Sequence, residues 1–160
     1  MLRRSLLVAA MLVVPAALAA APATLAAASV AASHAPTCSG VIQITRLAFT
    51  PVVVAPGQTA TLQLTARNCT GISQQTTSVW LGRFVGPAAG IPPGCPAIDP
   101  LPLPASFAPH GQVRSSVGYL VPSGCTATQL QVTVEFEQGG AVLAERTADL
   151  GIIVQPAAAS

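Results

Sequence analysis

The sequence predicts an all-β fold, a Greek-key sandwich of about seven short strands. Apolar and polar residues alternate in steps of two in one segment after another, and no window keeps the three-and-four spacing of an amphipathic helix. Turn signals separate these segments, among them Pro56-Gly57 and Gly139-Gly140. About 125 residues remain behind an N-terminal export segment, which is enough for one hydrophobic core and too few for two. One domain is therefore expected.

Seven strands are expected, at 41–49, 52–54, 59–67, 76–85, 112–121, 129–137 and 141–154. In 59–67, alanine and leucine at the even positions alternate with threonine, glutamine and arginine at the odd positions. In 129–137, leucine, valine and phenylalanine alternate in the same way with glutamine, threonine and glutamate. Because such alternation buries one face of a strand and leaves the other in water, these two segments are expected to be central strands.

Residues 1–28 have the features of a signal peptide. Arg3 and Arg4 begin it, an apolar run follows over 6–14, and an alanine-rich stretch offers several cleavage points. The run is shorter than the roughly 20 residues that a membrane span needs, and an uncleaved anchor is the alternative. The protein is therefore expected to be secreted, or associated with the cell surface, and to be free of the membrane after cleavage.

The rest of the chain is expected to divide into a flexible mature N-terminus at 29–37, a folded domain at 38–155 and a disordered tail at 156–160. The formal charge of +2 comes from the two arginines of the signal peptide. Five arginines then face five acidic residues, so the mature chain is neutral. A neutral chain lacks the overall basic field that attracts nucleic acid or an anionic membrane. We therefore expect a monomer with no nucleic-acid partner.

A resemblance to a known family rests on residues 51–59, which read Pro-Val-Val-Val-Ala-Pro-Gly-Gln-Thr, and on the alternating strand that follows them to Asn68. This stretch resembles the opening of bacterial extracellular immunoglobulin-like modules of the cell-adhesion-related kind. The resemblance implies an immunoglobulin-like Greek-key β-sandwich at 38–155. Residues 91–100 also resemble small secreted actinobacterial proteins of unassigned role, and the absence of lysine is typical of a GC-rich genome such as an actinobacterium's.

Four cysteines, Cys38, Cys69, Cys95 and Cys125, permit three pairings, and the sequence alone does not choose among them. In a sandwich of the immunoglobulin type, the chain start and the turn after the second strand lie at one end. The connection after the third strand and the turn before the sixth lie at the other end. The resemblance therefore implies a Cys38–Cys69 bridge and a Cys95–Cys125 bridge. Export and the absence of a CxxC spacing argue against a metal site.

The search for catalytic chemistry finds little. His110, in a Pro-His-Gly turn, could form a base with Asp99 and a serine, but no Gly-x-Ser-x-Gly elbow is present. Glu135 and Glu137 lie on the predicted wet face of one strand. Trp80 falls where an immunoglobulin-like sandwich buries a tryptophan, so we favour a core residue over a platform for sugars. We expect no enzyme, and no catalytic, metal or cofactor-binding residue.

The connection at 86–110 is the segment with the strongest claim to function. It is rich in proline and glycine, and such a long connection in a compact domain is usually functional or disordered. One interpretation is a presented binding loop, stiffened by polyproline geometry. The other is that it replaces edge strands and caps the sheet, with prolines blocking aggregation. The candidate binding residues are Ile91, Pro92, Pro93, Ile98, Asp99, Leu101 and Leu103.

Two functions follow from these observations. The first is a secreted, non-enzymatic immunoglobulin-like module that binds or spaces at the cell surface, with a protein or a surface polymer as partner. The alternative is a secreted protease inhibitor that presents the disulfide-tethered loop 86–110. Residues 95–100, Cys-Pro-Ala-Ile-Asp-Pro, are similar to the reactive loop of the subtilisin-inhibitor family of actinobacteria, although the loop is a residue shorter and the first two cysteines lie farther apart.

Overall fold

A computed structural model describes residues 37–153, and all the regular structure in this part of the chain is β-strand. The all-β prediction is therefore confirmed. The signal peptide at 1–28, nearly all of the N-terminal segment at 29–37 and the tail at 156–160 are predictions that lie outside the described residues. No helix in the described part is long and apolar enough to cross a membrane.

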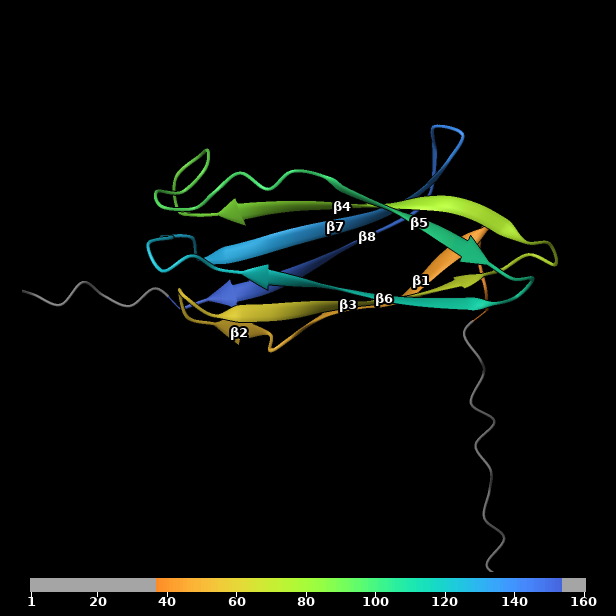
Figure 1. Cartoon of the computed structure of the whole chain (residues 1–160), viewed down its shortest axis with the longest axis horizontal. Helices are drawn as coiled ribbons and strands as arrows, with labels where there is room; N and C mark the ends of the chain where they lie inside the picture. The colour runs from red at the N-terminus through yellow and green to blue at the C-terminus, as the bar shows by residue number, and fades with distance from the viewer. Residues whose placement is uncertain (1–36, 154–160) are drawn as a thin grey trace, which may run out of the picture. The chain divides into compact units, whose positions relative to one another are not determined.

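Eight strands form two sheets that pack face to face (Figure 1). In chain order they are β1 (Ile42–Thr50), β2 (Val53–Val54), β3 (Thr59–Asn68), β4 (Gln74–Val85), β5 (Leu101–Phe107), β6 (Gln112–Leu120), β7 (Gln129–Gln138) and β8 (Ala141–Ile152). The smaller sheet has the order β1-β3-β6 and the larger has the order β2-β8-β7-β4-β5. Neighbouring strands are antiparallel except for β2 and β8, which are parallel.

The core lies between the sheets and consists of the alternating inward residues that the sequence predicts. Leu62 and Leu64 on β3 face Leu130, Val132 and Val134 on β7, and all are fully buried or nearly so. Burial of each such side chain contributes about 1.5 to 3 kcal/mol of stability. The predicted central strands 59–67 and 129–137 are therefore central in the structure as well.

The connection between β4 and β5 corrects the interpretation of 86–110 as one long loop. Residues 101–107 form β5, which pairs with β4 from Gln74 to Trp80 and is the edge strand of the larger sheet. Pro102 and Pro104 lie within it. Because proline has no N–H to donate, these residues fit an edge strand when their nitrogens face the free edge. Residues 101–107 are therefore an edge strand, and the connections on either side of it are 86–100 and 108–111.

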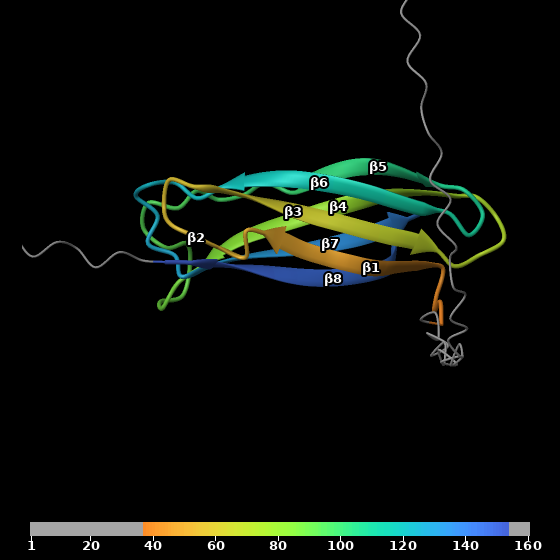
Figure 2. The same cartoon turned by 90° about the horizontal axis from the view of Figure 1, so that it is seen from below.

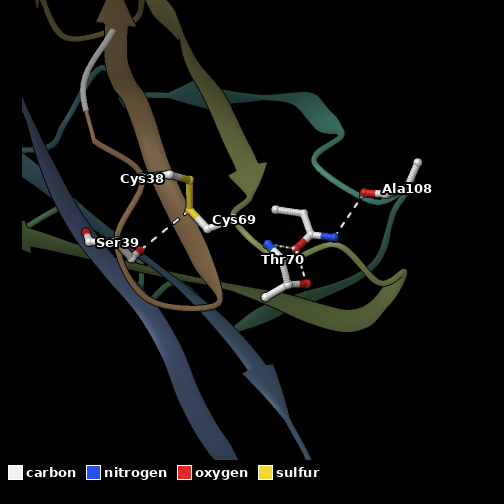
Figure 3. The surroundings of a disulfide bond; sticks show 6 residues. Cys38, Ser39, Cys69, Thr70 and Ala108 are labelled. Carbon is white, nitrogen blue, oxygen red and sulfur yellow. Dashed lines mark hydrogen bonds between the residues drawn. A yellow bond between two sulfur atoms is a disulfide. The ribbon is translucent and has the colours of Figure 1, made fainter. Parts of the chain in front are cut away.

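The two disulfides join Cys38 to Cys69 and Cys95 to Cys125, with Cα atoms 5.5 and 4.4 Å apart. These are the pairs that the strand order of an immunoglobulin-type sandwich implies. Figure 3 shows the first pair, in which the Cys69 sulfur lies 3.6 Å from the Ser39 carbonyl oxygen. A disulfide sulfur carries no hydrogen, so this is a van der Waals contact.

Asn68, next to this disulfide, anchors the end of the sandwich. Its amide nitrogen donates to the carbonyl oxygens of Ile72 (2.7 Å) and Ala108 (2.9 Å), and its amide oxygen accepts from the backbone N–H of Thr70 (2.9 Å; Figure 3). The side chain is 0% exposed. Although Asn68-Cys69-Thr70 fits a glycosylation sequon, the burial of its amide makes the asparagine a structural residue.

Candidate functional site

The two long margins of the sandwich differ, and the difference creates a groove. Along one margin β1 lies beside β8, and along the other β5 lies beside β6 (Figure 2). No ladder of backbone hydrogen bonds joins β5 to β6, because they belong to different sheets. A hollow of about 330 Å³ opens near this margin. Its lining consists of Trp80, Phe84, Pro96, Ile98, Asp99, Leu101, Val117, Gly118, Tyr119 and Leu120, which we call the β5–β6 groove.

Trp80 forms the floor of the groove from β4. The indole is 1% exposed, which confirms the predicted core position. Its Nε1 donates to the Ser78 Oγ at 3.2 Å, and that hydroxyl donates to the Leu103 carbonyl oxygen at 3.2 Å. A buried indole N–H needs such a partner, so Ser78 fixes the ring at the bottom of the groove lining.

Tyr119 reaches the groove from β6. Its ring packs edge to face on Phe49, with centroids 5.8 Å apart. Burial raises the pKa of the Tyr119 phenol to about 12, because the phenolate would lose its hydration. The Tyr119 side chain therefore stays uncharged even above its ordinary pKa, while Asp99 supplies the one acidic side chain of the groove lining.

The loop 86–100 closes over the groove through Ile98. A Cβ built on Gly82 would lie 3.0 Å from two carbon atoms of Ile98, so the isoleucine occupies space that a side chain at position 82 would need. The inward-facing Gly82 therefore admits Ile98 between the sheets. Any larger residue at position 82 would push the loop outward.

The Cys95–Cys125 disulfide and backbone contacts hold the same loop at its base. The backbone N–H of Thr126 donates to the Pro93 carbonyl oxygen at 3.0 Å. Gly94 has a positive φ of 72°, and a Cβ there would collide with the Gly124 carbonyl group. Glycine is therefore required where the loop meets the turn before β7. The loop is fixed by one covalent bond and by close backbone packing.

The structure places the predicted binding residues in four kinds of position. Ile98, Asp99 and Leu101 line the β5–β6 groove. Leu103 is half-buried and packs on the core, and Pro92 is buried. Pro93 is exposed. Ile91 is 63% exposed and lines a separate hollow of about 570 Å³ formed by residues 83–91.

The predicted binding residues omit seven of the ten groove residues, among them Phe84, Val117 and Tyr119. Phe84 and Tyr119 are buried side chains of the core. Their second role depends on how far apart β5 and β6 lie, which no local pattern encodes. The half-exposure of Val117 on β6 is the structural sign that the margin is open.

The residues considered for catalysis do not meet. Asp99 precedes β5 and His110 follows it, so seven strand residues, about 23 Å of extended chain, separate them. His110 is exposed, with a positive φ of 53°, and its backbone N–H donates to Thr70. Within residues 37–153, no three His, Cys, Asp or Glu side chains gather in a way that could hold a metal ion.

No family model matches the chain, and no curated protein matches it. Among solved structures, the chain is similar to the Pseudomonas fluorescens alkylpurine DNA glycosylase AlkC bound to DNA containing an abasic site analog. The identity is 14% and the TM-score is 0.53, over 73% of this chain and 32% of that chain. At this identity the shared feature is the fold, and the chain spans about a third of the length of the glycosylase.

This comparison corrects two expectations from the sequence, that the chain is not an enzyme and that it has no nucleic-acid partner. The similar solved structure is an enzyme, and it is bound to DNA. The physical reason for the second error is that net charge says nothing about where charges lie. The strands β1, β3 and β6 carry three arginines and no acidic residue. A neutral chain can therefore present a basic face.

Proposed function

We propose that this chain is an exported immunoglobulin-like module that binds a partner at the cell surface through the β5–β6 groove. The observation that carries the proposal is the groove itself, an apolar cavity lined by aromatic side chains and one carboxylate and bordered by a disulfide-tethered loop. Ligand sites are typically concave and apolar, with few polar groups that fix orientation. An apolar group of the partner, such as an aliphatic or aromatic side chain, is the expected occupant.

The strand order supports the immunoglobulin-like part of the proposal. The strands β1, β3 and β6 correspond to A, B and E of such sandwiches, and β4, β7 and β8 correspond to C, F and G. A buried tryptophan on strand C is typical of these domains, and Trp80 lies on β4. The predicted signal peptide and the two disulfides support export, because disulfides persist in oxidising compartments.

The protease-inhibitor alternative receives less support. A reactive loop must project its side chains into a protease, whereas Ile98, at the centre of the similar segment 95–100, packs inward over Gly82. Titration of subtilisin or trypsin with the purified protein separates the two functions. We expect no stoichiometric inhibition, and a tight 1:1 inhibition would reject the proposed function.

Binding to intact bacterial cells, followed with fluorescently labelled protein, tests the groove. Leu101→Asp places a charge in the groove lining, and Ile91→Asp makes the same change at an exposed aliphatic residue outside it. We expect Leu101→Asp to weaken binding about fivefold or more, as for a central contact residue, and Ile91→Asp to bind as the unchanged protein does. Equal affinities for the two variants would exclude the groove as the binding site.

A further inference from the structure

The charged residues on the outer face of the smaller sheet are all basic. Arg46 on β1, Arg67 on β3 and Arg114 on β6 are its charged residues, and these strands hold no acidic residue. All three point away from the core, because their sequence neighbours Leu47, Ala66 and Val113 point into it. Arg46 and Arg114 are exposed and Arg67 is half-buried. We call these three residues the arginine face.

The register of the sheet brings the arginines together. Arg46 and Arg114 are both paired with Thr65, one on each side of it, so about 10 Å separates their strands. Arg67 follows Thr65 by two residues, about 7 Å along β3. Among the described residues, no hydrogen-bond partner is found for these three guanidinium groups, whereas Arg83 donates to Gln131.

The outer face of the larger sheet carries the opposite charge. Glu135 on β7 lies directly opposite Glu145 on β8, and Glu137 follows two residues along β7. Like charges directly opposite each other destabilise a sheet. The nearest base on this face, Arg83, donates to Gln131, which lies four residues before Glu135 on β7 and itself donates to Asp149 at 3.2 Å. We call Glu135, Glu137 and Glu145 the glutamate face.

We propose that the arginine face of one copy docks on the glutamate face of a second copy. Each face holds three uncompensated charges of one sign within a triangle of about 5 to 10 Å, so the two surfaces are complementary in charge and in size. Each copy carries both faces on opposite sheets. The contact is therefore heterologous, and it can continue beyond a dimer into a stack.

The association is expected to be weak and sensitive to salt. A face of three nine- to ten-residue strands covers roughly 300 to 400 Å², which puts the contact below the size of stable interfaces. Exposed ion pairs contribute little individually and are screened at moderate ionic strength. The β5–β6 groove lies on a margin rather than on either face, so this inference does not depend on the proposed function.

Sedimentation velocity of the purified protein over a concentration series tests the stacking. We expect growth beyond a dimer at low ionic strength, and its loss at about 0.5 M salt, where the Debye length falls to a few ångströms. Arg46→Gln with Arg114→Gln, and separately Glu135→Gln with Glu145→Gln, should each weaken self-association at least tenfold. An equimolar mixture of these two variants should form a dimer that grows no further, because one intact contact remains between unlike copies.

Arg83→Gln with Arg146→Gln is the matched control, since it removes the same charge outside the arginine face and should leave stacking intact. A wild-type protein that stays monomeric at low salt would overturn the proposal. So would a mixture of the two face variants that stays monomeric, or a basic face that binds a DNA duplex while the protein does not self-associate.

Discussion

The two long margins of the sandwich are closed in different ways. On the β1–β8 margin the backbone itself joins the sheets, because the chain leaves β1 of the smaller sheet and its next strand, β2, pairs with β8 of the larger sheet. The Gly151 N–H donates to the Val52 carbonyl oxygen at 3.0 Å, and the Ile153 N–H donates to the Val54 carbonyl oxygen at 2.9 Å. On the β5–β6 margin only side chains and the loop 86–100 meet across the opening.

The difference bears on where the proposed binding site can lie. Backbone hydrogen bonds hold the closed margin together, and they protect the edge of the larger sheet. The open margin keeps apolar side chains at the bottom of a groove, and its edge strand β5 contains two prolines that discourage strand addition. A partner of this margin is therefore expected to insert side chains rather than to add a strand.

Removal of one disulfide at a time should give the largest loss of stability. Cys38–Cys69 and Cys95–Cys125 close loops of nearly equal length, with separations of 31 and 30 residues. Replacement of either pair by alanine should cost about 3 to 4 kcal/mol of unfolding free energy on the chain-entropy model. Chemical denaturation of each variant measures the loss.

The two variants should differ at the groove. Trp80 is the single tryptophan of the chain, so its fluorescence reports on the groove floor. Loss of Cys95–Cys125 frees the loop 86–100 and should increase quenching by acrylamide, whereas loss of Cys38–Cys69 should not. Equal quenching in both variants would show that the disulfide does not hold the loop over Trp80.

Paired leucine substitutions compare the packing of the two margins directly. Leu150 on β8 is 0% exposed, and Leu103 on β5 is half-buried. Leu150→Ala should lower the free energy of unfolding by about 3 kcal/mol, because it leaves a cavity in a closed core. Leu103→Ala should cost about 1 kcal/mol, since less of that side chain leaves water on folding. Urea denaturation with matching m-values would measure both, and equal losses would mean that the open margin is packed as tightly as the closed one.

Clean alternation of apolar and polar residues predicts a strand from the sequence. The one strand that the sequence does not predict, β5, lacks this alternation. Residues 59–67 and 129–137 alternate between a buried and a wet face, and each forms a central strand. Residues 101–107 contain Leu-Pro-Leu-Pro, which indicates a loop because proline cannot donate to a ladder. At a sheet edge one side of the strand needs no donors, so β5 forms there. Only the position of the segment in the folded sheet distinguishes a loop from an edge strand here.

The candidate site could be predicted only in part for a related reason. The pattern of prolines and a cysteine singles out the loop 86–110, and Ile98, Asp99 and Leu101 from that loop do line the groove. The opposite wall comes from β6, whose partner across the margin is set by the sheet order rather than by local sequence.

The distribution of charge over the surface likewise depends on the sheet order and not on the sequence alone. A sum over the chain gives neutrality, whereas the register of β1, β3 and β6 places three arginines on one face.

The smallest predicted effect concerns the hydroxyl of Tyr119 on the open margin. Its pKa is raised to about 12 in the folded protein, while the ordinary value of 10.0 applies to the unfolded chain. The folded state therefore holds the proton more tightly, so this contribution to stability is complete below pH 10 and declines as the pH rises toward 12. By pH 11 the loss should reach about 1 kcal/mol. The chain has a single tyrosine, so phenolate absorbance titrates Tyr119 directly. Tyr119→Phe should flatten the decline in stability between pH 9 and 11. A phenol that titrates near pH 10 in the folded protein would show instead that water reaches the groove freely.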